Sequence, residues 1–268
     1  MSSSPDLIEL VSPHGRARVS RQGAQVLDAQ LQGRPLLWLS PLALFEAGKA
    51  IRGGVPICFP WFGKHPAGLP AHGFARNHDW NLLEQRADRV CFELRDDPRS
   101  RALWPFAFRL TLAITLDSRL HFDFRVENRD TQSFDFSYAL HSYFAVGDCR
   151  ECSLDGLAGR LRREVGHVTT PQPGSIALAL PIDANFESAP DPLALHDGDR
   201  TIEIAAEGMR SAVVWNPGAA AETVADIGRH WPEYVCVERG NIGAATVTLL
   251  PGETHRAGMD LGWYEKGR

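Results

Sequence analysis

Three side chains that could exchange protons with a ligand lie in largely apolar stretches of the sequence: His141, Asp183 and Glu238. Histidine and glutamate are frequent proton donors and acceptors in enzymes, because their pKa values can be tuned towards neutral pH. Two of these residues also have a purely structural interpretation. His141 could be a hydrogen-bonded histidine of a sheet, and Asp183, taken alone, could be a turn residue.

Glu238 lies among apolar β-forming residues, in the stretch Val235-Cys236-Val237-Glu238-Arg239. A carboxylate in this position either pairs with Arg239 or faces a cavity. Successive residues of a strand point to opposite faces, so Arg239 is a poor partner for its neighbour. This argument favours the cavity, but both interpretations stay open.

A bent apolar segment, Ile51–Gly63, and its continuation, Ala71–Asn77, carry two arginines. The many Gly and Pro residues argue against a helix or a long strand, and the aromatic residues argue against a solvated linker. Such backbone usually forms the wall of a cavity. Arg52 and Arg76 need anionic partners if they are buried in it. The segment therefore predicts a site for an anion.

Several other residues are weaker candidates. His72 precedes Gly73 in the same wall and could line a site or only hydrogen-bond the backbone. Asp226 falls in a short predicted helical turn, where a solvated or capping residue is expected. Cys149 and Cys152 form a single C-x-x-C pair, which is half a zinc site at best, so reduced thiols are expected there.

Strand patterns dominate the chain and must position these residues. Hydrophobic and polar residues alternate over 106–115, 120–127 and 134–140, which is the period of antiparallel strands with one buried face. Further strands are expected at 6–11, 16–20, 24–31, 34–39, 79–85, 89–95, 175–180, 200–206, 211–215, 234–239, 244–250 and 255–261. Helical turns are expected only near 97–100 and 222–228. The pattern predicts an all-β fold, a large antiparallel β-sandwich, with residues 1–268 forming a single domain.

Charge and hydropathy narrow the class of partner. The 268 residues carry a formal net charge of −5 without a run of Lys or Arg, which argues against nucleic acid or a membrane surface as a partner. The strongest apolar run, Leu36–Phe45, is far shorter than a membrane span. Residues 1–6 lack the basic and apolar regions of a signal peptide. We therefore expect a soluble, cytoplasmic protein.

Six segments, taken together, resemble one known family. The segments are Ile51–Pro56, Ala71–Arg76, His141–Phe144, the region of Asp183, Trp215–Pro217 and Cys236–Glu238. Their order and spacing are similar to those of the glucose-6-phosphate 1-epimerases (hexose-6-phosphate mutarotases), a branch of the aldose 1-epimerase or galactose mutarotase-like superfamily. The resemblance extends over essentially the whole chain. It implies a β-supersandwich with the sugar site in an open cleft.

The resemblance also implies roles for individual residues. By motif position, His141 matches the family's catalytic acid and Glu238 its catalytic base. The remaining matches are substrate-binding positions, of which the histidine is the loosest: Arg52, His72, Arg76 and Asp183. The implied substrate is a small hexose 6-phosphate, and no cofactor or metal is implied. We expect a monomer.

The chain departs from the family pattern at three points. Ala71 stands where a Gln is expected, and Arg239-Gly240 follows Glu238 where Pro-Gly is typical. Phe186 lies near the position of a usual tyrosine. These differences bear on substrate preference more than on the chemistry.

Two other functions stay open. In an epimerase for unphosphorylated aldoses, Arg52 and Arg76 would be internal ion-pair partners, for which Asp79 and Glu84 are available. A non-catalytic β-sandwich could bind a sugar phosphate without accelerating any reaction. Such a module would not need a histidine and a glutamate at the two catalytic positions.

Overall fold

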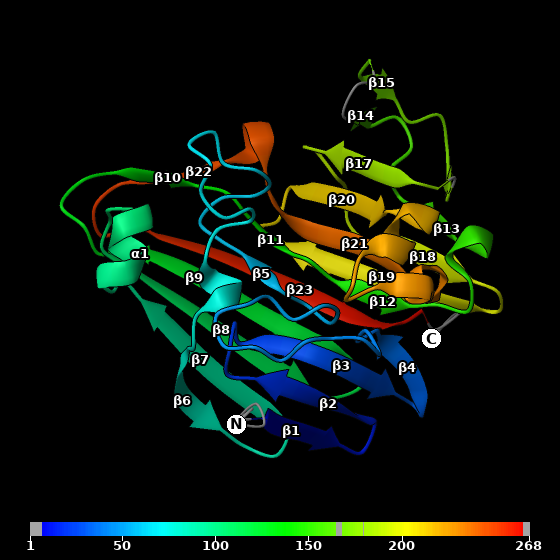
Figure 1. The fold of residues 1–268 in the computed structure, drawn as a ribbon, viewed down its shortest axis with the longest axis horizontal. Coiled ribbons are helices and arrows are strands. Elements are labelled where there is room, and N and C mark those ends of the chain that lie inside the picture. Colours follow the sequence, from blue (N-terminus) through cyan, green and yellow to red (C-terminus); the bar gives the residue numbers. More distant parts are fainter. Residues whose placement is uncertain (1–6, 165–167, 179, 265–268) are drawn as a thin grey trace.

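Two large antiparallel sheets form the molecule, and the computed structural model describes residues 7–164, 168–178 and 180–264 (Figure 1). The first sheet follows the order β1-β2-β3-β4-β12-β21-β11-β5, with β20 and then β17 on the other side of β21. The second follows the order β16-β13-β18-β19-β23-β9-β8-β7-β6. The predicted all-β, antiparallel fold class is confirmed.

The strands of the first sheet are β1 (Leu7–Ser12), β2 (Gly15–Ser20), β3 (Gln25–Leu31), β4 (Arg34–Leu37), β5 (Ile57–Cys58), β11 (Tyr138–Leu140), β12 (Tyr143–Ala145), β17 (Ile182–Phe186), β20 (Ser211–Asn216) and β21 (Tyr234–Asn241). Those of the second sheet are β6 (Asn81–Gln85), β7 (Arg89–Arg95), β8 (Phe108–Leu116), β9 (Leu120–Asn128), β13 (Ser153–Asp155), β16 (Ile176–Ala177), β18 (Leu193–Asp197), β19 (Arg200–Glu207) and β23 (Thr254–Trp263). Two small pairs complete the set: β10 (Phe134–Phe136) with β22 (Val247–Leu249), and β14 (Leu161–Arg162) with β15 (Thr170–Pro171).

The hydrophobic core contains side chains from both sheets. One cluster of buried residues includes Leu10 and Val26 of the first sheet and Phe122 and Phe124 of the second. The long strands β8, β9 and β23 lie side by side through the middle of the molecule (Figure 1). Every second residue of β9 is buried, which confirms the alternation expected there.

The predicted strand over 134–140 is instead two strands in different sheets. β10 pairs with β22, whereas β11 pairs with β21 and β5. Phe134, Phe136 and Tyr138 are all buried, so the alternation continues across the break and gives no sign of it.

Several strands were not predicted, among them β12 and β17 of the first sheet and β13 and β18 of the second. β17 lies where turn-forming Asp183 and Asn185 alternate with buried apolar residues, and β18 extends the second sheet. The strand expected at 175–180 is reduced to β16, and residue 179 lies outside the described residues.

Helical structure is short. The helix α1 (Pro98–Leu103) begins with a capping box, in which the Ser100 N–H donates to Asp97 Oδ1 at 2.7 Å, as expected for this stretch. The other turns are 3₁₀: η1 (Ala75–Asn77), η2 (Cys149–Glu151), η3 (Gly218–Thr223), η4 (Gly228–Glu233) and η5 (Gly243–Ala245). The turn predicted at 222–228 is thus replaced by η3 and η4, with Asp226 between them. In the described ranges, we find no helix long and apolar enough to cross a membrane.

Gly54 lies where the wall segment crosses β3. Its φ is +62°, and a Cβ there would lie 1.9 Å from the carbonyl oxygen of Val26. Gly54→Ala is therefore expected to lower the free energy of unfolding by about 3 kcal/mol or more, measured by urea denaturation. Gly33 also has a positive φ, +73°, but no heavy atom lies within 4 Å of its would-be Cβ. Gly33→Ala should lower the free energy of unfolding by only about 1–2 kcal/mol. Equal losses of stability in the two variants would contradict the close approach at Gly54.

Candidate active site

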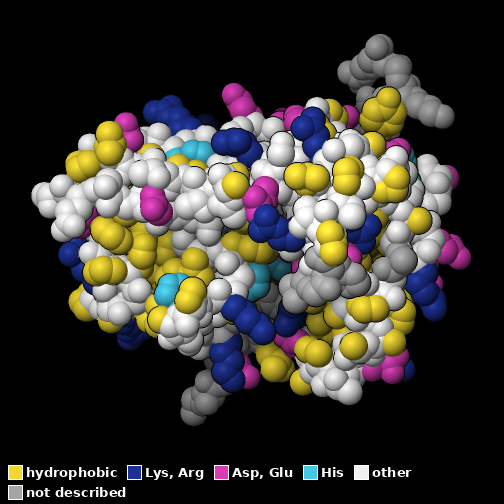
Figure 2. Space-filling model, turned by 90° about the horizontal axis from the view of Figure 1, so that it is seen from above, with side chains coloured by type: hydrophobic (Ala, Val, Ile, Leu, Met, Phe, Trp, Pro, Cys, Tyr) yellow, Lys and Arg dark blue, Asp and Glu magenta, His cyan; other side chains and the backbone are white. Residues whose placement is uncertain are grey.

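A cavity of about 660 Å³, a size typical of small-molecule sites, contains all the predicted site residues. Its lining includes Arg52, His72, Arg76, His141, Asp183 and Glu238. In the view of Figure 2, histidine side chains are visible in a hollow near the centre of the face, with Lys or Arg side chains beside it. The structure therefore brings these widely separated residues to one place.

The register of three strands builds the floor of the cavity. Glu238 of β21 lies opposite Val213 of β20, and Val213 lies opposite Asn185 of β17. Residues directly opposite in an antiparallel sheet share a face, and all three line the cavity. Val237, the neighbour of Glu238, belongs to the hydrophobic core instead. The cavity thus lies on the face of the first sheet that points away from the core.

Arg239 confirms that the two charged neighbours in β21 do not pair. It is only 1% exposed, and its Nη1 and Nη2 donate to the carbonyl oxygens of Pro190 and Met209 at 3.1 and 3.0 Å. The prediction that Arg239 is a poor partner for Glu238 is therefore confirmed.

The wall of the cavity is the bent segment between β4 and β6. The Val55 N–H donates to the Val26 carbonyl at 2.8 Å, and the Phe74 N–H donates to the Phe59 carbonyl at 2.9 Å. Phe59 and Phe74 are buried in the core. A Cβ at Gly73 would lie 2.0 Å from the Phe59 carbonyl oxygen, so glycine allows the two parts of the wall to meet. The predicted bent apolar wall is present.

His141 and Glu238 meet at the floor. His141 Nε2 lies 3.3 Å from Glu238 Oε1, and the side chains are 9% and 2% exposed. The imidazole stacks on the ring of Tyr143, with centroids 4.8 Å apart and planes 9° apart, and contacts the ring of Trp215 edge-on. Neither Nδ1 of His141 nor Oε2 of Glu238 has a hydrogen-bond partner among the described residues. Packing rather than a second hydrogen bond therefore orients the imidazole.

The surroundings of this pair shift both pKa values. Burial, with repulsion from the two wall arginines and from His72 when that ring is protonated, holds the pKa of His141 well below its usual value. Burial, with the negative charge of Asp183, raises the pKa of Glu238 well above its usual value. Each shift favours the neutral form of its side chain.

Arg52 is held from two sides. Its Nε donates to Asp226 Oδ2 at 3.1 Å, and its Nη1 donates to the Tyr143 hydroxyl at 3.0 Å. The prediction that Asp226 is a solvated or capping residue is wrong, because its carboxylate is ion-paired with Arg52. The two residues are 174 positions apart, so no local pattern could reveal their contact.

Arg76, on η1, retains unused hydrogen-bonding capacity. Its Nη2 donates to the Ala71 carbonyl at 2.9 Å, and its buried Nε has no partner among the described residues. Glu84, considered above as a structural partner for the wall arginines, pairs with Arg86 and Arg89 instead. A guanidinium with an unused donor at a cavity wall suits an anionic ligand.

His72 adopts a left-handed backbone conformation, with φ of +64°. Its Nδ1 accepts from the Gly63 N–H at 3.4 Å and lies 3.3 Å from Cys58 Sγ. Burial and the positive charges of Arg76 and Arg52 lower the pKa of His72 to about 4. The ring is therefore neutral at pH 7.

This shift predicts a pH-dependent stability. An unfolded histidine titrates near pH 6.5, so between pH 6.5 and about 4 the unfolded state binds a proton that folded His72 does not. Stability should fall through this range by up to ~3 kcal/mol from this residue alone. Asn tolerates a positive φ, so His72→Asn should fold and lose less stability than wild type between pH 7.5 and 4.5 in urea titrations. Parallel losses in both proteins would show that His72 does not resist protonation.

Some cavity residues were missed or misplaced by sequence reasoning. Lys64, Tyr143, Asn185 and Trp215 line the cavity without having been assigned a role. Asn185 could have been found by strand alternation from Asp183, had β17 been expected.

Of the aromatic wall residues, Phe62 lines the cavity. Trp61 and Phe74 pack against each other, with ring centroids 6.1 Å apart.

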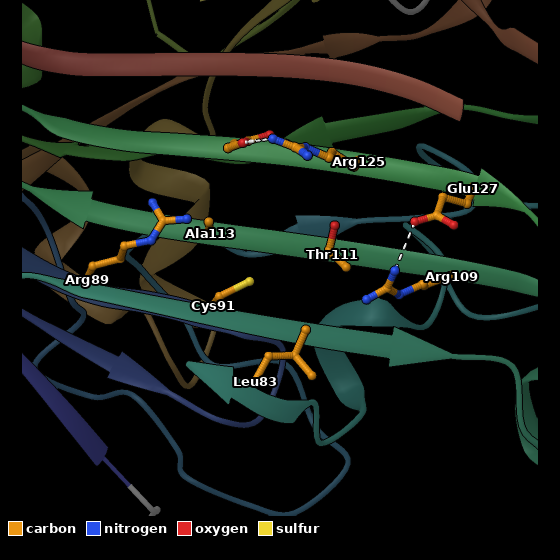
Figure 3. A pocket seen from close by; sticks show the side chains of 9 residues that line it. Leu83, Arg89, Cys91, Arg109, Thr111, Ala113, Arg125 and Glu127 are labelled. Carbon is orange, nitrogen blue, oxygen red and sulfur yellow. Dashed lines mark hydrogen bonds and ion pairs between the residues drawn. The ribbon is translucent and has the colours of Figure 1, made fainter. Parts of the chain in front are cut away.

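A second hollow lies on β7, β8 and β9 of the other sheet (Figure 3). Arg109 pairs with Glu127 at 3.2 Å, and Arg125 pairs with Asp123. Arg89, also in the lining, pairs with Glu84 at 3.5 Å. The charged groups of this hollow thus already have partners, in contrast to Arg76 in the wall of the first cavity. The first cavity is the better candidate site.

Within the described part of the chain, no group of three or more His, Cys, Asp or Glu side chains could hold a metal ion. Cys149 and Cys152 have buried, free thiols at η2, and Cys149 Sγ contacts the Trp231 carbonyl at 3.7 Å.

Comparison with known proteins gives consistent matches along the chain. The sequence profile of a family described as aldose 1-epimerase matches residues 6–262. A protein of Cenchrus ciliaris is 32% identical, over 94% of this chain and 87% of that protein. A protein of Escherichia coli is 33% identical, over 87% of this chain and 82% of that protein. Both carry the provisional name glucose-6-phosphate 1-epimerase.

Solved structures show the same fold. A Salmonella typhimurium protein, provisionally described as a mutarotase, superposes with a TM-score of 0.88 at 29% identity, over 98% of this chain and 92% of that one. A Synechocystis protein superposes with a TM-score of 0.84 at 22% identity, over 99% of each chain.

Proposed function

Because the chain belongs to the aldose 1-epimerase family and is therefore a sugar epimerase, we propose that it interconverts the α and β anomers of a hexose 6-phosphate, with glucose 6-phosphate as the preferred substrate. One observation carries the proposal: His141 and Glu238 meet at the floor of a cavity whose wall holds Arg52 and Arg76. The provisional names of the relatives support a phosphorylated substrate.

Interconversion requires only proton transfers. In the proposed mechanism Glu238 removes the proton from the C1 hydroxyl while His141 protonates the ring oxygen. The bond between C1 and the ring oxygen breaks, the resulting aldehyde turns about the C1–C2 bond, and the ring closes on its other face with return of both protons. On closure the two residues exchange roles: His141 takes the proton of the C5 hydroxyl, and Glu238 returns its proton to the C1 oxygen, so both regain their starting protonation states.

The arginines supply charge that a phosphate would complement. Guanidinium groups donate paired N–H bonds to phosphate oxygens, and Arg76 Nε has no other partner in the described part of the chain. The charges of Arg52 and Arg76 also lower the pKa of His141. A bound phosphate dianion would offset those charges, so it would favour the protonated His141 that acts as the acid.

A second candidate is an epimerase for unphosphorylated aldoses. It is favoured by the ion pair of Arg52 with Asp226, since a purely structural arginine would make the same contact. Polarimetry on freshly dissolved α-glucose and an assay of α-glucose 6-phosphate coupled to an anomer-specific dehydrogenase separate the two. We expect clear acceleration with the phosphorylated sugar and little with glucose. Equal acceleration would favour the second candidate, and phosphate-sugar binding without acceleration would indicate a non-catalytic module.

A further inference from the structure

The contacts of Arg52 restrict how this residue can meet a ligand. A guanidinium has five N–H donors, and here Nε is used by Asp226 and one hydrogen of Nη1 by Tyr143. Among the described residues, none accepts from Nη2 or from the second hydrogen of Nη1, so these hydrogens remain for a ligand. Arg52 itself lines the cavity, so this unused edge is the part of the side chain available there.

The backbone of Asp226 is held without the side chain of Arg52. Its backbone carbonyl accepts from the Ser40 hydroxyl at 2.7 Å, and the Ser40 N–H in turn donates to the Arg52 carbonyl at 3.1 Å. Ser40 is buried. The loop that carries Asp226 and the start of the wall are therefore joined through one serine, close to the ion pair.

Asp226 does not belong to the lining of the cavity, although its partner Arg52 does. A carboxylate in the lining would repel a phosphate. Behind the arginine, it can hold the guanidinium without meeting the ligand. We propose that Asp226 is a positioning residue that holds Arg52 in its phosphate-binding orientation, so that this acidic residue helps set the preference for phosphorylated sugars. The inference rests on the proposed function.

The position of His141 does not depend on the contact between Arg52 and Asp226. Tyr143, which orients His141 by stacking, also packs against Trp38, Trp215 and Tyr234, with ring centroids 6.0, 6.3 and 5.2 Å away. The Tyr143 ring therefore keeps its place without the bond from Arg52. A change at Asp226 should raise KM for the phosphorylated sugar and leave kcat within about twofold.

Two opposing effects follow from removal of the carboxylate. The orientation of Arg52 is lost, which weakens phosphate binding. The negative charge is also lost, which strengthens the attraction of the cavity for any anion. Asp226→Ala removes the charge and the hydrogen bond together, whereas Asp226→Asn removes the charge but keeps an acceptor oxygen. The two variants therefore separate orientation from charge.

The test uses the full-length protein with glucose 6-phosphate as substrate and inorganic phosphate as a competing ligand. If Asp226 positions Arg52, Asp226→Ala raises KM and the inhibition constant of phosphate by about tenfold, the size expected for one charge-assisted hydrogen bond. Asp226→Asn raises both by about threefold or less. The double variant Arg52→Ala with Asp226→Ala raises KM and the inhibition constant no further than Arg52→Ala alone, because both changes remove the same interaction.

Other outcomes overturn the inference. A KM below that of wild type in both variants would show that charge dominates. An equal fall of kcat/KM for glucose and glucose 6-phosphate, with a lower thermal midpoint, would show a merely structural role. If Asp226→Ala does not fold, Asp226→Asn tests the inference instead. A KM and a phosphate inhibition constant above those of wild type support it, and values at or below those of wild type overturn it. If wild-type protein has the same kcat/KM for glucose and glucose 6-phosphate, the proposed function is overturned as well. If a folded Asp226→Ala keeps the wild-type preference for glucose 6-phosphate, only the positioning role is overturned.

Discussion

Glu238→Gln is expected to lower kcat for anomer exchange of glucose 6-phosphate by about 10²–10⁴-fold, the usual contribution of a general base. Gln is nearly isosteric, so it can occupy the buried position opposite Val213 and keep a polar contact with His141. Binding of the sugar phosphate, measured by calorimetry, should change little because the wall arginines are untouched. The coupled dehydrogenase assay measures the rate.

A second poorly exposed carboxylate provides the control. Glu93 is 5% exposed and lies in the other sheet, where it bonds to Arg95 at 2.7 Å and to Arg109. Glu93→Gln should therefore leave the cavity unchanged, and we expect a rate within about twofold of wild type in folded protein. A near-normal rate in Glu238→Gln would remove Glu238 from the mechanism.

Arg52→Ala is expected to reduce kcat/KM for glucose 6-phosphate by roughly 10–100-fold, the range for lost hydrogen bonds to a charged group. The loss for free glucose should be less than about threefold, because glucose has no phosphate to hold. Arg52→Lys keeps the charge but cannot make both fixed contacts, to Asp226 and to Tyr143, so an intermediate loss is expected.

Loss of Arg52 also leaves Asp226 without its ion-pair partner, so a thermal midpoint must accompany the kinetics. Arg18→Ala is the matched control, because Arg18 pairs with Asp28 at an exposed position outside the cavity. Arg18→Ala should leave kcat/KM for both sugars unchanged. Equal losses on both sugars in Arg52→Ala would mean that Arg52 serves the fold rather than the phosphate.

Periodic patterns predicted the fold class because the side chains of β9, and those of β8 except Ala113, alternate between buried and partly exposed. The same reasoning failed where local signals conflicted with tertiary structure. Asp183 and Asn185 favour turns, yet pairing with β20 makes their segment a strand. A change of sheet at Ser137 left the alternation intact and could not be seen.

The candidate site depended on a different kind of information. His141 and Glu238 stood out from their apolar surroundings, but their roles came from the family resemblance, and only the fold shows that they touch. The partner of Arg52 could not be predicted, because an ion pair over such a separation depends on how two loops pack. The expected Gln is replaced by Ala71, which lines the cavity with a methyl group.

Arg239 bears on how β21 can change in evolution. It and Glu238 are consecutive, and its guanidinium is bonded to two carbonyls on the core side. Inserting or deleting one residue in β21 would exchange the faces of the two side chains. A guanidinium would then occupy the cavity floor, and a carboxylate would enter the core. Single-residue length changes in this strand would therefore invert the charge beside the sugar, whereas substitutions would alter it only one group at a time.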